Sequence, residues 1–152
     1  MIFDCGGNIK DSRMTTLGSE LAIIMLISGH WNAIVKIENA LPRLANKLEL
    51  NIQNKRTTLR EKTQDMIPYG VEVVAVDLPG VIKDVTNFFF QRGIGIEDLY
   101  TIAYPAPHTG TPMSSLHMIV GVQTDTAIAT LRGEFMDLCD DLNLDAMLAP
   151  IK

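Results

Sequence analysis

The sequence is short of several residue types and patterns, and each shortage excludes a class of protein. Only two of the 152 residues are cysteines, Cys5 and Cys139, which is too few for a disulfide framework or a zinc site and fits a reduced, cytoplasmic setting. No apolar run approaches the roughly 18 residues that a membrane span needs. Because the opening MIFDC carries an acid and no basic segment, we do not expect a signal peptide.

Positive charge is also scarce, and it is unevenly placed. The net charge is −5 and the isoelectric point about 5.1, whereas a protein that binds DNA by itself usually has a basic face. Up to Ile67 the chain carries 9 Lys/Arg and 7 Asp/Glu, and beyond it 4 and 11. The basic surplus lies partly in NKRTTLREK, residues 54–62, which is either a solvated linker or a patch for a partner. We therefore expect no direct binding of nucleic acid.

Catalytic, cofactor and metal-binding patterns are missing as well. His30, His108 and His117 are not spaced as a ligand set, and Cys139 has no histidine nearby that would make it a nucleophile. GIGIEDL, residues 93–99, lacks the third glycine of a dinucleotide loop and follows a helix, so it is better explained as a helix end. Since the arginines are scattered and form no anion clamp, a small enzyme is the disfavoured class.

What the sequence does contain is a unit that occurs twice, and the second half holds the complete copy. Strand-like and helical segments follow one another there in the order βαββαβ, which indicates an α+β fold. Pro79 can start the first helix, and Gly93 can end it. The expected elements are strand 71–77, a helix with Ile82, Val85, Phe88 and Phe89 facing inward, strands 94–104 and 114–123, a helix capped by Thr124 or Asp125 with the stripe Ile128, Leu131, Phe135, Leu138 and Leu142, and strand 144–151.

The first half repeats this unit from its middle. An offset of 87 residues places Gly6 on Gly93 and Asp11 on Asp98, and we expect both acids to serve a turn or cap at a strand end. The helical stripe of the first half matches that of the later helix at an offset of 94 residues. The expected elements are strands 8–17 and 19–28, a helix with the stripe Ile34, Ile37, Leu41, Leu44 and Leu48 that kinks or resets at Pro42, and strand 48–56.

Residues 71–87, which span the first strand and most of the first helix, have no counterpart in the first unit. We expect that roughly 17 or more residues of the ancestral unit are absent here, through a misplaced start, a truncation or a real deletion. Strands one and three are central in a split βαββαβ fold, so the loss exposes unpaired backbone. The first unit is therefore expected to be the less stable half.

One segment of the first unit also predicts association. LAIIMLIS, residues 21–28, is apolar on both faces of the expected strand. Helices can cover only one face of a two-layer sheet, so the other face should meet a second unit or a second chain. We expect a homo-oligomer or a close pairing of the two halves.

Residues 6–57 closely resemble the first half of the glycine cleavage system transcriptional repressor family, a pair of ACT domains in tandem. The most specific stretches are NIKDSRM, LISGHWNAI and KRT, and the second half resembles the family more loosely, mainly through VDLPGVIKDVTNFFFQRGIGIEDL. The resemblance implies two ferredoxin-like ACT units. These are an incomplete unit at 1–58 that lacks strand one and most of helix one, a linker at 59–69, and a complete unit at 70–152.

The resemblance also implies a ligand site. ACT domains are small-molecule sensors, often for amino acids, and the ligand sits between the first strand–helix turn of one unit and the start of strand two in a paired unit. Amide groups at the helix N-terminus favour a carboxylate, and glycines let a ligand approach the backbone. The implied residues are Asp77, Leu78, Pro79, Gly80 and Val81 in the turn, Gly93, Ile94, Gly95 and Ile96 at the strand start, and Gly6, Gly7, Asn8 and Ile9 as the share of the paired unit.

The function implied by the resemblance is repression of the glycine cleavage operon in response to an amino acid, with glycine as a candidate. The chain is acidic, and the cores of the repeat use every helix stripe, so no helix-turn-helix is expected. Repression would then act through contact with an activator protein and not through DNA. The alternative is an ACT-type amino-acid sensor that regulates a metabolic enzyme in trans.

Overall fold

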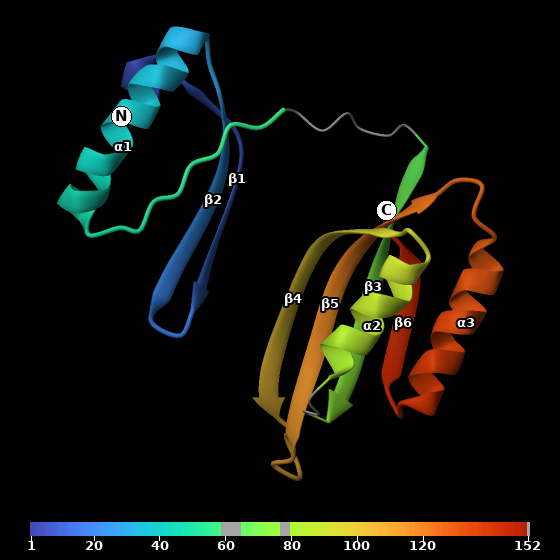
Figure 1. The fold of residues 1–152 in the computed structure, drawn as a ribbon. Coiled ribbons are helices and arrows are strands. Elements are labelled where there is room, and N and C mark those ends of the chain that lie inside the picture. Colours follow the sequence, from blue (N-terminus) through green and yellow to red (C-terminus); the bar gives the residue numbers. More distant parts are fainter. Residues whose placement is uncertain (59–64, 77–79, 152) are drawn as a thin grey trace. The chain divides into compact units, whose positions relative to one another are not determined.

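The computed structural model describes residues 1–58, 65–76 and 80–151 of the chain. These residues form two compact units, Met1–Arg60 and Glu61–Lys152, each with its own sheet (Figure 1). The expected α+β architecture, with an incomplete unit followed by a complete βαββαβ unit, is confirmed.

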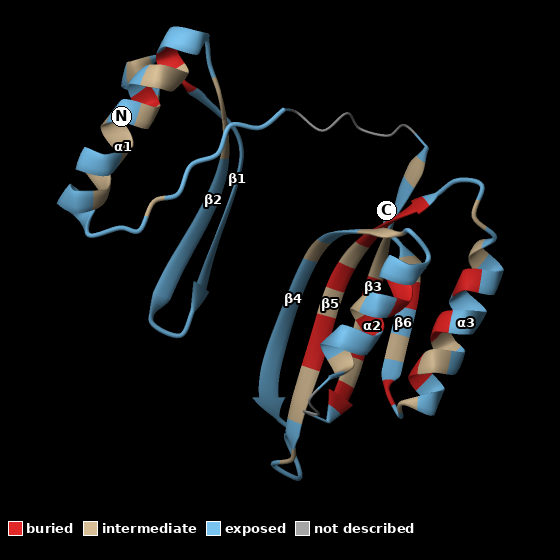
Figure 2. Ribbon diagram, viewed as in Figure 1, coloured by how far each residue is buried: buried red, intermediate tan, exposed pale blue. Residues whose placement is uncertain are grey.

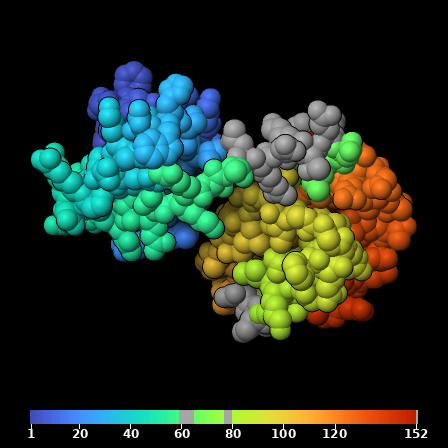
Figure 3. Space-filling model, turned by 45° about the horizontal axis from the view of Figure 1, so that its top comes forward, coloured from blue at the N-terminus to red at the C-terminus, as the bar shows by residue number. Residues whose placement is uncertain are grey.

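The second unit is a complete βαββαβ sandwich. Its elements are β3 (Met66–Val76), α2 (Val81–Gln91), β4 (Gly95–Pro105), β5 (Pro112–Gln123), α3 (Ile128–Asp141) and β6 (Asp145–Pro150). The strands form one antiparallel sheet in the order β4-β5-β3-β6, and α2 and α3 cover one face of it (Figure 1). Figure 3 shows α2, in yellow-green, as the outer layer on this side.

The core of the second unit lies between the helices and the sheet. Three phenylalanine rings form its centre, with Phe89 5.1 Å from Phe88 and 5.3 Å from Phe135 between ring centroids. Alternate residues of the two central strands pack against them. The buried strand residues are Val71, Val73 and Ala75 on β3 and Leu116, Met118, Val120 and Val122 on β5.

The inward stripe of α2 differs from the expected one at a single position. Ile82 was expected to face the core, but it is exposed, and Val81 packs against the core instead. Positions 81, 85, 88 and 89 keep the helical spacing of three and four residues, so Val81 completes the stripe one residue earlier. The two phenylalanines of the stripe, Phe88 and Phe89, are both buried as expected.

The first unit is an open structure with much apolar surface exposed. It consists of the short helix η1 (Phe3–Cys5), strands β1 (Asn8–Leu17) and β2 (Glu20–Ser28), which form an antiparallel hairpin, and helix α1 (Trp31–Leu48). Only Ala33 and Ile37 of α1 are buried (Figure 2). Pro42 lies inside α1, and the helix continues from Trp31 to Leu48 without the reset that was one of the two expected outcomes there.

The repeat is visible in individual hydrogen bonds. At the end of α2 the amide of Gly93 donates to the carbonyl of Phe90 (3.0 Å), and the amide of Ile94 donates to the carbonyl of Phe89 (3.0 Å). The same pair occurs 87 residues earlier: Gly6 donates to Phe3 (2.9 Å) and Gly7 to Ile2 (3.0 Å). This is the hydrogen-bond pattern of a helix C-terminus that ends in a left-handed glycine.

The strands that follow these two turns repeat as well. A β-bulge interrupts the pairing of β1 between Ile9 and Asp11, and a matching bulge interrupts β4 between Ile96 and Asp98. Asp11 and Asp98 therefore each lie at the end of a β-bulge, near the start of β1 and of β4. The side chain of Asp98 also accepts a hydrogen bond from the amide of Leu99 (3.1 Å).

The expected strand 48–56 is wrong. In the second unit the corresponding strand, β6, pairs only with β3. The first unit has no counterpart of β3 among its described residues, so residues 51–58 find no partner and form no strand. Arg56 instead makes two hydrogen bonds to the carboxylate of Glu38 on α1, at 2.9 and 2.8 Å, and this partner lowers the pKa of Glu38.

Two boundaries also differ from expectation. β3 begins at Met66, inside the expected linker at 59–69, because β5 extends to Gln123 and provides a partner for these residues. The second unit therefore starts before residue 70. The N-cap of α3 is Ala127, with no side-chain hydrogen bond, where Thr124 or Asp125 was expected to cap the helix.

Candidate functional site

The turn before α2 is the first part of the expected ligand site. Asp77, Leu78 and Pro79 lie outside the described residues. Gly80 is the N-cap of α2, with a left-handed φ of 104°, and as a glycine it has no side chain with which to cap the helix. The N-cap residue therefore gives the amides of the first turn no acceptor, and amides at a helix N-terminus favour a carboxylate ligand.

Asp84 adds an acid to this helix start, and the sequence analysis did not single it out. A β-carbon built on Gly80 would lie 3.9 Å from Oδ2 of Asp84, so the carboxylate faces the turn. Asp84 lies in the first turn of α2. A zwitterionic amino acid needs donors for its carboxylate and an acid for its ammonium group, and this helix start offers backbone amides and Asp84. The sequence signal that could have identified Asp84 is its position four residues after Gly80, one helical turn away.

Residues Gly93 to Ile96 form the second part of the expected site, at the other end of α2. Gly93 has a left-handed φ of 68°, which a residue with a side chain rarely adopts, and Gly95 begins β4. Since α2 has 11 residues, the two parts lie roughly 16 Å apart along the helix axis. The structure therefore does not bring them together within the second unit.

Arg92, another residue that sequence reasoning missed, holds the end of α2 in place. Its guanidinium donates to Glu134 of α3 (2.7 Å) and to the carbonyl of Phe88 (3.0 Å), and lies 3.7 Å from the centre of the Phe88 ring. One side chain thus ties α2 to α3 next to Gly93. The neighbouring Phe88 and the later Glu134 gave no local pattern from which this cluster could be read.

Residues Gly6 to Ile9 form the third part, in the first unit. Gly6 has a left-handed φ of 86°, as Gly93 has. A β-carbon at Gly7 would lie 2.5 Å from Cδ1 of Ile37, so a side chain there would force Ile37 of α1 to shift. Asn8 and Ile9 begin β1 and pair with Ser28 and Ile27. The first unit thus presents the same strand start as the second.

Cys139 and His117 are reactive side chains outside the expected ligand site. Burial raises the pKa of the Cys139 thiol to about 11, with the neighbouring Asp140 adding to the shift. Within the described ranges, no group of three or more His, Cys, Asp or Glu side chains could hold a metal ion. His117 stacks on Tyr100, with 4.7 Å between ring centroids, and its Nε2 lies 2.6 Å from Oγ of Ser115.

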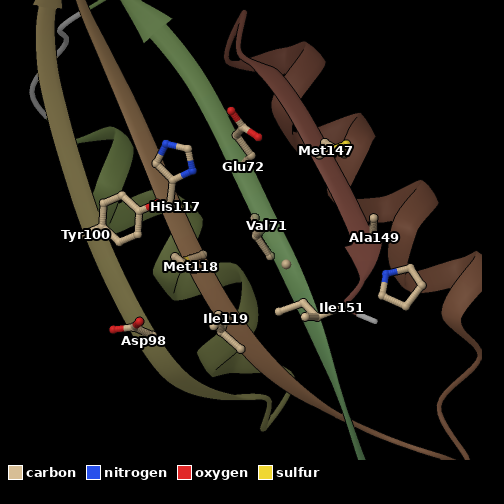
Figure 4. Close-up of a pocket in the computed structure, with 12 residues that line it drawn as sticks. Val71, Glu72, Asp98, Tyr100, His117, Met118, Ile119, Met147, Ala149 and Ile151 are labelled. Carbon is tan, nitrogen blue, oxygen red and sulfur yellow. The ribbon is translucent and has the colours of Figure 1, made fainter. Parts of the chain in front are cut away.

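A hollow of about 350 Å³ lies on the second unit, away from the expected site (Figure 4). Side chains of four strands line it, including Glu72, Asp98, Tyr100, His117 and Met147. None of the expected ligand residues contributes to it. No helix in the described part of the chain has the length and apolar character to cross a membrane.

Comparison with known proteins gives three findings that bear on this geometry. A family model described as the ACT domain matches residues 1–55, the first unit. The chain is 34% identical to the glycine cleavage system transcriptional repressor of Escherichia coli (strain K12) over 142 residues, which are 93% of this chain and 75% of that protein. The corresponding protein of Shigella flexneri matches to the same extent.

Solved structures agree with the sequence comparisons. A crystal structure assigned as a glycine cleavage system transcriptional repressor has a TM-score of 0.74 and 30% identity, covering 99% of this chain and 85% of that chain. An unknown protein from Galdieria sulphuraria has a TM-score of 0.76 over 99% of this chain and 86% of that chain, but at 21% identity this likeness concerns the fold alone.

Proposed function

Because this chain belongs to the family of the glycine cleavage system transcriptional repressors, we propose that it represses the glycine cleavage operon in response to an amino acid. The family and its ACT domain support a transcriptional regulator that senses a small molecule. Glycine is the ligand we propose, and the cytoplasm is where such a repressor would act.

The ligand site that we propose combines two units. The amides at the start of α2, from Gly80 and Val81 onward, take the carboxylate of the amino acid, and Asp84 takes its ammonium group. Asp77, Leu78 and Pro79 complete the turn in this proposal. Gly93 to Ile96, or Gly6 to Ile9, belong to the paired unit. The separation of the two ends of α2 supports a site between units, since one unit does not close it.

Repression in this proposal acts through a protein and not through DNA. The chain carries a net charge of −5, so it gains little from phosphate contacts, which supply most of the affinity of DNA-binding proteins. We propose that it binds the activator of the operon, and that the amino acid changes the affinity of this contact by binding one state of the repressor better than the other. We further propose that the repressor is a homo-oligomer.

A gel-shift series tests this function. Operon promoter DNA is combined with the purified activator, with this protein, and with both, at physiological salt and with or without glycine. We expect no shift with this protein alone, a further shift with both proteins, and a change in that shift when glycine is present. A shift by this protein alone would contradict the proposed mechanism.

A matched pair of variants tests the site. In Asp84→Asn the ammonium group loses its acid, so we expect glycine binding measured by calorimetry to weaken about tenfold. Asp137→Asn removes an exposed acid of α3 and should leave the affinity unchanged. Equal affinities of the two variants would place the ammonium site elsewhere.

The alternative function is regulation of a metabolic enzyme in trans by the same amino-acid sensor. Copurification separates the two possibilities. A transcription factor recovered with the tagged chain supports repression, whereas a metabolic enzyme recovered in its place supports the alternative. The repressor relatives favour the first.

A further inference from the structure

The hollow of the second unit lies on the face of its sheet that α2 and α3 leave open (Figure 4). Small residues of two neighbouring strands form its floor, since Gly70 of β3 lies opposite Ala149 of β6. Ile151 borders this floor, because a β-carbon built on Gly70 would lie 3.5 Å from Cγ1 of Ile151. The space above Gly70 and Ala149 is therefore open, where larger side chains would have filled it.

A carboxylate lies beside the floor. Glu72 is two residues from Gly70 on the same face of β3, between His117 of β5 and Met147 of β6. It is half-buried, and within the described ranges no lysine or arginine forms an ion pair with it. Glutamate is uncommon in strands, and a partly desolvated charge without a partner costs free energy. A cation from outside the chain would relieve this cost.

The wall beside Glu72 is aromatic and is held by its own contacts. The ring of His117 stacks on Tyr100, with 4.7 Å between centroids, and its Nε2 lies 2.6 Å from Oγ of Ser115. Both contacts hold the imidazole in place, and Ser115 is itself buried. The wall is therefore formed before any ligand arrives, as in most sites for small molecules, and Glu72 is the charged group next to it.

The charges around the hollow determine the sign of a ligand. The four strands of the sheet contain no lysine or arginine, so an anion would find no ion-pair partner on them. Asp98 also lines the hollow, but its carboxylate is already engaged, in part with the amide of Leu99 (3.1 Å). Glu72 is therefore the acid that a cation would meet. The volume of about 350 Å³ is at the lower end of the roughly 300–1,000 Å³ of small-molecule sites, so the ligand is small.

We propose that the hollow binds a small organic cation, an alkylammonium whose charged head pairs with Glu72 and whose apolar stem lies over Gly70 and Ala149. Residues two apart in a strand are separated by about 6.6 Å, so a stem of about four carbons reaches from the carboxylate to the floor. The ligand differs from the amino acid proposed for the start of α2, because the carboxylate of an amino acid would meet Glu72 and Asp98 as like charges. The proposal does not depend on the repressor function.

The first test is a titration of the isotope-labelled full chain with n-butylammonium chloride, followed by NMR. We expect the amide signals of Gly70, Glu72 and Ala149 to shift, with a dissociation constant of about 1–10 mM for so small a probe. Sodium butyrate has the same stem with the opposite charge, and ammonium chloride has a cation without a stem. At equal ionic strength we expect each of these two to bind about tenfold more weakly than n-butylammonium.

The second test repeats the titration with variants of the full chain. Glu72→Gln removes the charge and keeps the shape, so we expect the affinity for n-butylammonium to fall about fivefold. Gly70→Ala adds a methyl group to the floor at 3.5 Å from Ile151, an ordinary contact distance, and should lower the affinity about threefold by occupying the space of the stem. Asp137→Asn removes an exposed acid of α3 and should leave the affinity unchanged. The amide spectrum of each variant also shows whether it is folded.

Three results would overturn this proposal. One is that the signals of Gly70, Glu72 and Ala149 do not shift at concentrations well above the expected dissociation constant, or that the shifts are confined to the start of α2 near Asp84. Another is equal binding of butyrate and n-butylammonium, since the hollow would then only adsorb apolar stems. The third is an affinity that is the same in Glu72→Gln and in Asp137→Asn, since the ammonium group would then be held by another acid.

Discussion

Three phenylalanines in succession, at 88–90, offer the sharpest test of the second core. Phe89 is fully buried, whereas its neighbour Phe90 is 78% exposed on the same helix. Phe89→Ala and Phe90→Ala therefore remove the same atoms from adjacent positions in α2. Because both variants replace phenylalanine by alanine in one helix, the difference between their stabilities reports core packing and not helix propensity.

The expected magnitude follows from the environment of the Phe89 ring. Truncation of a buried phenylalanine to alanine costs about 3–5 kcal/mol. Phe89 also contacts two other rings, Phe88 at 5.1 Å and Phe135 at 5.3 Å, and each such pair contributes about 0.5–1.5 kcal/mol beyond burial. We expect Phe89→Ala to lower the free energy of unfolding by about 4 kcal/mol. Phe90→Ala should change the free energy of unfolding by less than about 0.5 kcal/mol, because Phe90 is exposed and alanine is the better helix former.

The aromatic residues provide an assay for each unit separately. The single tryptophan, Trp31, lies in the first unit, and the three tyrosines, Tyr69, Tyr100 and Tyr104, lie in the second. Urea unfolding is followed by tyrosine and by tryptophan signals. With a slope of about 1–3 kcal/mol per molar urea, a loss of about 4 kcal/mol moves the tyrosine midpoint by more than about 1 M.

The control and the refuting result come from the same titration. Phe90→Ala should leave the tyrosine midpoint where it is in the unaltered protein. If Phe89→Ala cost less than about 1 kcal/mol, or if Phe90→Ala cost as much as Phe89→Ala, the core at α2 would not be the one described.

Three further predictions concern the turns, the thiols and the first unit. Gly93→Ala forces a side chain into a left-handed backbone and should cost about 1–2 kcal/mol by urea unfolding, whereas Gly133→Ala in α3 should be neutral or stabilising. With its pKa raised to about 11, Cys139 stays protonated at pH 8 and should not react with a thiol reagent until the protein unfolds. The stability that the buried neutral thiol contributes is lost as the pH rises toward about 11. Rapid modification of both cysteines in the folded protein would contradict this prediction. In hydrogen exchange, β2 should open before β3 and β5, because its hairpin has only two strands, and equal protection would count against an open first unit.

Local sequence signals determined the elements and the repeat. The bounds 8–17 for β1 were predicted without error, because the repeat identifies this segment as the second strand of the unit. The offset of 87 residues predicted that Gly6 would end a helical turn as Gly93 does, and both are left-handed. A left-handed turn after a helix favours glycine for steric reasons that hold in any fold.

Contacts between distant segments determined what the sequence analysis missed. The ligand residues were inferred as a set from a resemblance, but the two ends of α2 separate Gly80 from Gly93. Asp84 is an exception, since it faces Gly80 through one turn of the same helix, which is a local relation. Arg92 joins Phe88 and Glu134 because α2 and α3 lie side by side on one face of the sheet.

The segment after α1 shows where the sequence by itself stops and the tertiary structure decides. The chain turns at Glu49 as it does at Asn143, with Leu50 donating to Ala45 and Leu144 donating to Cys139. Up to this turn the local sequence determined the same backbone conformation in both units. Beyond it, residues 145–150 form β6 because β3 offers them backbone partners, whereas residues 51–58 have no such neighbour among the described residues. A strand needs hydrogen bonds from another segment, so its formation depends on the tertiary structure and not on its own residues.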